Sequence, residues 1–208
     1  MKTMVYIDGF NLYFGAVKGT GHKWLNVVEA VQRHLSAQNI IVGTKYFTAK
    51  LNPRPNDPDQ PLRQDTYLRA LRTLPNFEIF FGFFLTKNVK LPLANPPANG
   101  PKRALVVKTE EKGSDVNLGS QLLNDGHLGR FECAVVVSGD SDLVMPVRIV
   151  KEELGLPVGV LNPQKNPCVE LKKHVTFYKH LKKGRLARSG FPGILTDAQG
   201  TFHKPSTW

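Results

Sequence analysis

A series of short, uninterrupted apolar segments limits the folds open to this chain more than any other feature of its sequence. Residues 4–7, 134–137 and 158–161 are such segments, and stretches with helical periodicity lie between them. A strand has this composition when both of its faces are covered, as in a parallel sheet whose connections are helices. The alternation therefore predicts βαβ units around a mainly parallel sheet.

The same periodicities predict the remaining elements and a single domain. Helices are expected at residues 27–35, 62–74, 115–123 and 143–154, and further strands at 40–47, 77–85, 104–109 and 175–178. At 208 residues the chain is long enough to bury a core, and its length favours one domain, which we expect at residues 1–183.

Two segments fall outside this alternation. Residues 86–103 are rich in Pro, Asn and Ala and predict a surface insertion such as a hairpin. Residues 184–208 contain Gly, Pro, Ser and Thr with little periodicity, so we expect a basic tail that is mobile or wrapped on the surface. The phenylalanines before the insertion are expected in the core rather than as a base-stacking surface, because Phe is usually buried; they are Phe80, Phe81, Phe83 and Phe84.

The chain is strongly basic, with 28 lysines and arginines against 17 acids and a formal charge of +11. This excess favours a polyanionic partner such as nucleic acid, although charge that serves only solubility is also common. Between residues 165 and 188, Glu170 alone offsets a run of basic side chains. The predicted nucleic-acid-binding residues are Lys112, Lys172, Lys173, Lys179, Lys182, Lys183, Arg185 and Arg188.

The cysteines and the N-terminal segment favour a cytoplasmic protein. Cys133 and Cys168 have neither zinc-site nor disulfide-framework spacing, so reduced thiols are expected. The first apolar run stops at Asp8, too early for a secretory signal. No segment approaches the roughly 20 apolar residues that a membrane helix needs, so no membrane partner is expected.

Aspartates follow the apolar strands at positions where ligands collect in open parallel sheets. Asp8 ends the first strand, Asp140 and Asp142 follow residues 134–137, and Asp115 opens a helix after another β-type run. The carboxyl ends of parallel strands meet in one crevice near the point where strand order reverses, so these carboxylates are expected to converge. A role as a helix N-cap stays open for each, and is least favoured for Asp8, because an acid that closes a buried strand is costly without partners.

Oxygen ligands without a His or Cys cluster suit Mg²⁺ or Mn²⁺ rather than zinc. Such a cation binds a phosphate oxygen and activates water for attack on a phosphodiester, so no nucleophilic side chain is needed. The chain has no Gly-Lys-Ser phosphate loop, no dinucleotide glycine fingerprint and no Gly-x-Ser-x-Gly elbow. These absences fit a metal site that acts on phosphodiesters.

Three motifs together resemble the NYN domain family, a PIN-like ribonuclease group that includes the LabA-like proteins. They are residues 8–11 (DGFN), 112–116 (KGSDV) and 138–142 (SGDSD), in the same order as in that family. The resemblance covers roughly residues 3–180. It implies an α/β, PIN-like three-layer sandwich with a mainly parallel sheet of order 3-2-1-4-5, helices on both faces, and RNA as substrate. It also implies that Mg²⁺ or Mn²⁺ is held by Asp8, Asp115, Asp140 and Asp142, and that Asn11 and Ser138 orient these acids or the scissile phosphate.

One position departs from the family, because many members carry a further acid where this chain has Gln121. A catalytically silent RNA-binding or adaptor module of the same fold therefore stays open. A HAD-like phosphohydrolase is a weaker alternative, since residues 139–142 also resemble the final acidic motif of that group. Its nucleophile motif requires Asp-x-Asp, and Phe10 occupies the second acidic position here.

Overall fold

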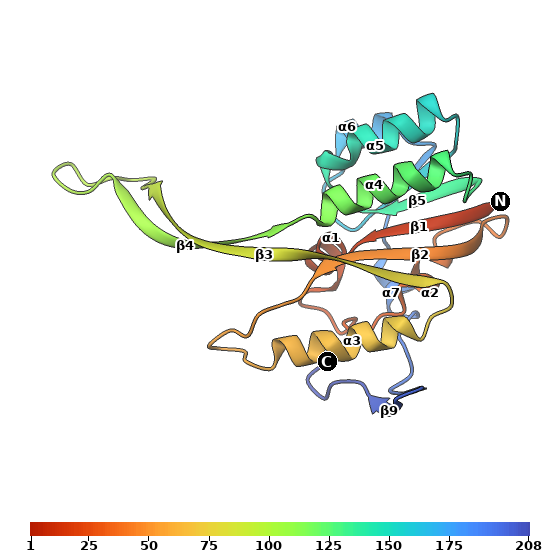
Figure 1. Cartoon of the computed structure of the whole chain (residues 1–208), viewed down its shortest axis with the longest axis horizontal. Helices are drawn as coiled ribbons and strands as arrows, with labels where there is room; N and C mark the ends of the chain where they lie inside the picture. The colour runs from red at the N-terminus through yellow and green to blue at the C-terminus, as the bar shows by residue number, and fades with distance from the viewer.

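The computed structural model describes residues 1–208 and has a seven-stranded sheet in the order β4-β3-β2-β1-β5-β6-β7 (Figure 1). Its strands are β1 (Lys2–Asp8), β2 (Ile40–Ala49), β3 (Phe77–Pro92), β4 (Arg103–Lys112), β5 (Cys133–Val137), β6 (Val158–Asn162) and β7 (Phe177–His180). A second, two-stranded sheet pairs β8 (Ile194–Asp197) with β9 (Gly200–His203). The α-helices are α1 (Gly9–Leu12), α2 (Val27–Gln32), α3 (Gln60–Arg72), α4 (Ser114–His127), α5 (Val144–Arg148), α6 (Val169–Lys173) and α7 (Lys183–Leu186). Two π-helical segments, η1 (Tyr13–Val17) and η3 (Ile149–Glu153), and one 3₁₀ helix, η2 (Ser141–Leu143), complete the helical elements.

The expected α/β class with a mainly parallel sheet is confirmed, and β3 with β4 is the one antiparallel pair in the large sheet. The order differs in detail from the expected 3-2-1-4-5. The succession β3-β2-β1-β5-β6 reproduces that order, and β4 and β7 each add a strand at one edge. Because chain order reverses at the neighbours β1 and β5, the carboxyl ends of these strands form the expected ligand crevice.

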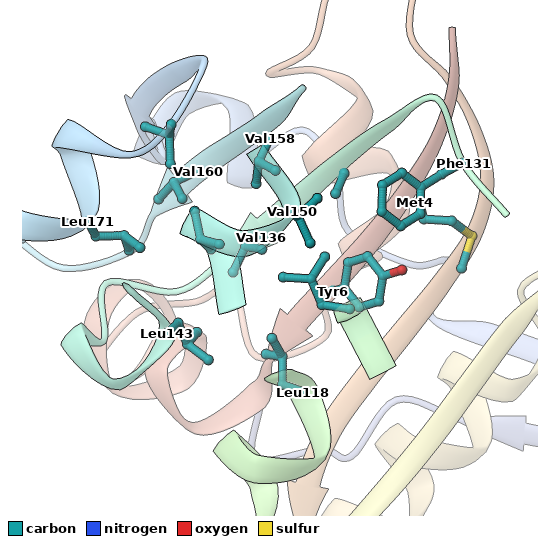
Figure 2. Packing of buried hydrophobic residues seen from close by; sticks show 14 of the residues in the cluster. Met4, Tyr6, Leu118, Phe131, Val136, Leu143, Val150, Val158, Val160 and Leu171 are labelled. Carbon is teal, nitrogen blue, oxygen red and sulfur yellow. The ribbon is translucent and has the colours of Figure 1, made fainter. Parts of the chain in front are cut away.

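Side chains of β1 alternate between two helical layers, which explains why its sequence is apolar without interruption. Met4 and Tyr6 lie in the cluster that includes Leu118 of α4, and Figure 2 shows this layer of the core. Val5 and Ile7 lie in the other cluster, formed with residues of α2, α3 and α7. Strand side chains point to alternate faces, so both faces of β1 must be apolar when helices cover both. No helix in the protein is both long and apolar enough to span a bilayer.

β3 and β4 form a long hairpin, and its part beyond the main sheet, residues 83–112, is called the β3–β4 arm below. The predicted insertion, residues 86–103, lies in the outer part of this arm. β3 pairs with β2 only as far as Gly82, and beyond that point it pairs with β4 alone. In Figure 1 the arm projects from the end of the sheet where β1 also ends. Phe80 stacks on Phe47 at a ring distance of 5.1 Å, as a core residue does. Phe81 and Phe83 are 39% and 60% exposed, so the prediction of a buried side chain is wrong at these two positions.

Residues 184–208 wrap over α3 instead of leaving the domain (Figure 1). Phe202 of β9 is buried with Trp24 and Ala70. Arg69 of α3 forms an ion pair of 2.7 Å with Asp197 of β8. Of the two forms expected for this segment, the structure therefore has the surface-wrapped one.

Candidate functional site

Asp8 occupies the end of β1 and caps the helix that follows. Its side chain is buried, with 5% of the residue exposed. Oδ1 accepts a hydrogen bond from the Asn11 backbone N–H at 2.9 Å, and Oδ2 accepts one from the Ser138 hydroxyl at 3.0 Å. The capping role that the sequence left open is thus present, and it uses one oxygen of the carboxylate.

The surroundings of Asp8 disfavour its negative charge. Burial, together with the nearby carboxylates of Asp115 and Asp140, raises its pKa to about 7, against the lowering effect of the two hydrogen bonds. No ion pair in the protein involves Asp8, Asp115, Asp140 or Asp142. A bound cation would stabilise a buried carboxylate that has acidic neighbours and no basic partner.

Ser138 links the acid of β1 to the acidic loop after β5. Its fully buried hydroxyl donates to Asp8 and accepts the backbone N–H of Asp140 at 3.1 Å. Asp140 is the N-cap of η2, and its Oδ1 accepts the Asp142 backbone N–H at 2.9 Å. The expected proximity of Asp8 and the loop 138–142 follows from the parallel pairing of β1 with β5.

Asp115 reaches the same region from the start of α4. It lies in the first turn of α4, after Gly113, whose φ of 95° is in the left-handed region that favours glycine. Burial, together with the nearby carboxylates of Asp140, Glu111 and Asp142, raises the pKa of Asp115 to about 6. Asp140 thus raises the pKa of both Asp8 and Asp115, so these three acids lie near one another.

Glu111 is a member of this group that the sequence reasoning missed. Its Oε1 accepts hydrogen bonds from the Ser114 backbone N–H at 3.2 Å and from the Ser114 hydroxyl at 2.7 Å. It therefore caps the start of α4. The available signal was an acid just before the Gly113-Ser114-Asp115 turn, since acids favour helix N-termini.

Asn11 joins three loops at the carboxyl ends of β1, β5 and β6. Its Oδ1 accepts the Gly139 backbone N–H at 3.0 Å and the Gln164 side-chain amide at 3.1 Å. The Gln164 backbone N–H in turn donates to Asn162 at 2.8 Å. Gln164 and Asn162 were not predicted, because nothing local in the sequence indicates which loops meet.

The acids share one end of the sheet but do not yet form a coordination shell. No three side chains of the His, Cys, Asp and Glu types lie close enough together to hold a metal ion. The ligand chemistry nevertheless fits Mg²⁺ or Mn²⁺: the donors are carboxylate oxygens without a cationic partner, and Mg²⁺ commonly uses one or two carboxylates and keeps several waters.

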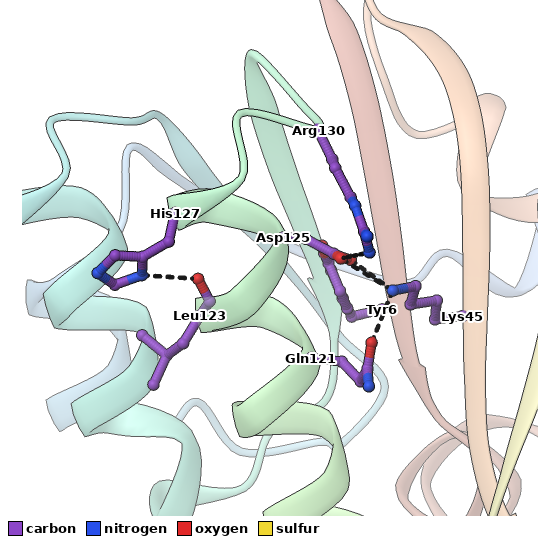
Figure 3. Close-up of polar contacts among 7 residues, drawn as sticks. All are labelled: Tyr6, Lys45, Gln121, Leu123, Asp125, His127 and Arg130. Atoms are coloured by element: carbon purple, nitrogen blue, oxygen red, sulfur yellow. Dashed lines mark hydrogen bonds and ion pairs between the residues drawn. The ribbon is translucent and has the colours of Figure 1, made fainter.

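Gln121 serves a different part of the molecule from these acids. Its Oε1 accepts a hydrogen bond of 2.7 Å from Lys45, which forms a buried ion pair of 2.7 Å with Asp125 (Figure 3). Asp125 also accepts from the Tyr6 hydroxyl and from Arg130, each at 2.8 Å. An acid at position 121 would therefore interact with Lys45.

Most of the predicted nucleic-acid-binding residues line the β7 edge of the molecule. Lys172 and Lys173 belong to α6, Lys179 to β7, and Lys183 and Arg185 to α7. Lys173 pairs with Glu170 at 2.7 Å, and Lys179 donates to the His34 carbonyl at 3.1 Å. Lys112 lies apart at the base of the β3–β4 arm and pairs with Glu110 at 3.3 Å. The remaining members form no ion pair: Lys172, Lys182, Lys183, Arg185 and Arg188.

Comparison with known proteins shows similarity to a family model, a curated protein and a solved structure. The family model described as NYN domain matches residues 2–180. The 6-hydroxy-3-succinoylpyridine 3-monooxygenase HspA of Pseudomonas putida is 27% identical over 236 residues, which cover 100% of this chain and 75% of that protein. A crystal structure of a protein of unknown function from Vibrio parahaemolyticus superposes with a TM-score of 0.54 at 13% identity, covering 87% of this chain and 93% of that one. The last similarity concerns the fold alone.

Proposed function

The chain belongs to the NYN domain family, and on that premise we propose that it is a metal-dependent nuclease that hydrolyses phosphodiester bonds in RNA. A PIN-like nuclease domain implies nucleic acid as the partner. The observation that carries the proposal is Asp8, a buried carboxylate at the switch point of the sheet, near Asp115 and Asp140 and without a basic partner. Proteins rarely bury an acid in this way without a function for it.

Asp8, Asp115, Asp140 and Asp142 are the residues that would hold Mg²⁺ or Mn²⁺. When bound, such a cation offsets charge at a phosphate oxygen and lowers the pKa of a water molecule. Ser138 supports this role, because its hydroxyl links Asp8 to the loop of Asp140 without adding positive charge. Above pH 7 Asp8 is mainly an anion, since burial and neighbouring acids raise its pKa only to about 7.

Asn11 acts in this proposal as a positioning residue. Its side-chain carbonyl is already occupied by Gly139 and Gln164, so it fixes the loop that carries Asp140 against the end of β1. Replacing Asn11 with Ala would free this loop. Removal of such a support is expected to lower the rate through displacement of Asp140 rather than through loss of a ligand.

The basic residues of the β7 edge supply phosphate contacts in the proposed complex. β7 is parallel to β6, so Lys182 and Lys183, which follow β7, lie toward the same end of the sheet as the acids. The β3–β4 arm offers a second set of cations on the other side, including Lys87, Lys90 and Arg103, which form no ion pair. Phosphate contacts of this kind position the strand without reading its sequence.

The test is incubation of the purified protein with single-stranded RNA, structured RNA and DNA, with Mn²⁺ or with chelator. The expected result is cleavage of RNA that requires the cation and is lost in Asp8→Asn. Asp59→Asn is the matched control, because Asp59 is an exposed acid whose side chain makes no capping hydrogen bond. Cleavage that persists in chelator would contradict the proposed role of the metal.

The named relative gives a second candidate, oxidation of a small pyridine compound, which its alignment with 100% of this chain favours. The two functions have different stoichiometry, since a monooxygenase consumes dioxygen and a reductant whereas hydrolysis consumes only water. Oxygen uptake with 6-hydroxy-3-succinoylpyridine and a reduced nicotinamide nucleotide, in the absence of RNA, would favour the second candidate. The nuclease proposal expects no uptake above background.

A further inference from the structure

A cavity of about 470 Å³ opens next to the acids, on the α3 side of the sheet. Gly9 and Phe10, which directly follow Asp8 in the chain, form part of its wall. Tyr46 and Glu111 also line it, and these residues interact electrostatically with Asp8 and Asp115 respectively. The volume lies within the ~300–1,000 Å³ of typical small-molecule sites. A molecule bound here would therefore lie beside the acids.

Aromatic side chains form much of the cavity wall. Phe10 meets Phe84 edge to face, with ring centroids 5.7 Å apart, and Tyr13 meets Phe14 in the same way at 5.2 Å. Phe14 is 57% exposed and belongs to none of the hydrophobic core clusters. Exposed aromatic rings around an open cavity suit a planar ligand, because a flat ring can stack on them.

The cavity is also positively charged. Its lining includes four basic residues against two acids, Asp57 and Glu111. Asp57 is already paired with Arg63 at 2.5 Å, and Glu111 is engaged by Ser114. The other three cations, Lys18, Lys23 and Arg54, form no ion pair and suit a phosphate or carboxylate.

One polar atom in the lining lacks a partner. The Oε1 of Gln60 is buried and makes no hydrogen bond. An unpaired buried acceptor costs on the order of 1–3 kcal/mol, so such atoms usually meet a ligand or a water. The exocyclic amino group or ring N–H of a nucleobase is a donor of the required kind.

We propose that this cavity is a nucleotide subsite, in which the base of an unstacked nucleotide packs against Phe10 and Phe84 while Lys18, Lys23 and Arg54 contact phosphates. This inference rests on the proposed nuclease function and adds the substrate class: a strand with an unpaired nucleotide next to the cleaved bond. A base within a duplex reaches such a cavity only after unpairing and unstacking, which costs a few kcal/mol. Single strands are therefore the preferred substrate.

The direct test is calorimetric titration of AMP and UMP in chelator, which removes cleavage from the measurement. Phe84→Ala should weaken binding about tenfold, the usual scale of one stacking contact. The matched control is Phe83→Ala, because Phe83 directly precedes Phe84 in the same strand, is 60% exposed and does not line the cavity. Arg54→Gln tests the charge with an exposed residue, and Arg72→Gln, outside the cavity, is its control.

The second arm compares a single-stranded RNA with the duplex of the same sequence, again in chelator. Phe84→Ala should reduce affinity for the single strand and leave duplex affinity unchanged. Absence of mononucleotide binding by the wild-type protein, or an equal loss in Phe83→Ala, would overturn the subsite. Binding of pyridine-3-carboxylate without binding of nucleotides would also overturn it, and would assign the cavity to small aromatic acids. Failure of the nuclease proposal is distinguishable, because it appears as absent Mn²⁺-dependent cleavage while nucleotide binding persists.

Discussion

Replacing Asp8 with Asn should make the metal-free protein more stable at alkaline pH. Asn keeps the size of the side chain and can accept the Asn11 N–H through its carbonyl oxygen. Its amide can donate to the Ser138 oxygen, which keeps the two side chains hydrogen-bonded but reverses the direction of that bond. What the substitution removes is the negative charge, which burial and two neighbouring acids disfavour.

The size of the effect follows from the pKa of Asp8. An increase from 3.8 to about 7 corresponds to ~4 kcal/mol at pH 8, at about 1.4 kcal/mol for each pH unit. Solvent screening reduces this free energy only slightly, because only 5% of Asp8 is exposed. Between pH 3.8 and 7 the folded carboxyl keeps its proton while the unfolded one loses it. Wild-type stability therefore falls as pH rises through this window, and the advantage of Asp8→Asn should grow over the same range.

Urea unfolding in chelator at pH 4.5, 6 and 8 would measure this difference. The expected gain in unfolding free energy is small at the lowest pH and reaches several kcal/mol at the highest. Asp59→Asn, at an exposed acid, should show no such trend. A variant that is less stable than the wild type at pH 8 would refute the reasoning, because it would mean that the Asp8 anion is stabilised by an interaction that Asn cannot replace.

Two further predictions concern the basic face and the buried ion pair. Alanine at Lys182, Lys183 and Arg185 should flatten the dependence of log affinity for single-stranded RNA on log salt by up to ~2, since each lost phosphate contact removes about 0.7 from the slope; an unchanged slope in binding titrations would mean that these cations serve only solubility. Lys45→Met should lower the unfolding free energy by ~1.5–3 kcal/mol in urea titrations, because it removes a charged hydrogen bond to buried Asp125, which keeps Tyr6 and Arg130 as partners. A loss below about 1 kcal/mol, the usual worth of an exposed pair, would contradict the burial of this network.

The sheet was largely predictable because its central strands are buried on both faces. Continuous apolar runs located β1, β5 and β6, and their right order followed from the family resemblance. The β3–β4 arm was harder to predict, because none of its residues is buried and no core face marks its strands. Even its apolar side chains Phe83, Leu105 and Val107 are more than half exposed, so hydrophobic periodicity does not report burial here.

The C-terminal segment shows a different limit. Its position depends on an aromatic cluster in which Trp24, Tyr67 and Trp208 meet, at ring distances of 5.9–6.3 Å. These residues are far apart in the sequence. No local propensity predicts such a contact, so the sequence left open whether residues 184–208 are mobile or wrapped on the surface.

The acids of the site were predictable and their supports were not. Asp8 and Asp140 follow apolar strands, and that position alone indicated a shared crevice. Gln164 acts through a contact with Asn11 that exists only once the loops have met. Glu111 makes a local contact with Ser114, and the acid before the Gly113 turn was the signal for it. The role of Gln121 was likewise invisible, since Lys45 reaches it from a strand 76 positions away in the sequence. Whether the four carboxylates bind a cation stays a prediction.

The central claim is that carboxylates at the end of β1 and β5 drive metal-dependent hydrolysis, and single-turnover cleavage of a single-stranded RNA by Asp140→Asn tests it most directly. Asn can still cap η2 but lacks the charge that holds a cation. With Mn²⁺, Asp140→Asn should cleave roughly a thousandfold more slowly than the wild type, a typical loss for a contact made in the transition state. RNA affinity in chelator and the melting temperature should remain close to those of the wild type. Cleavage by Asp140→Asn at the wild-type rate would contradict the claim.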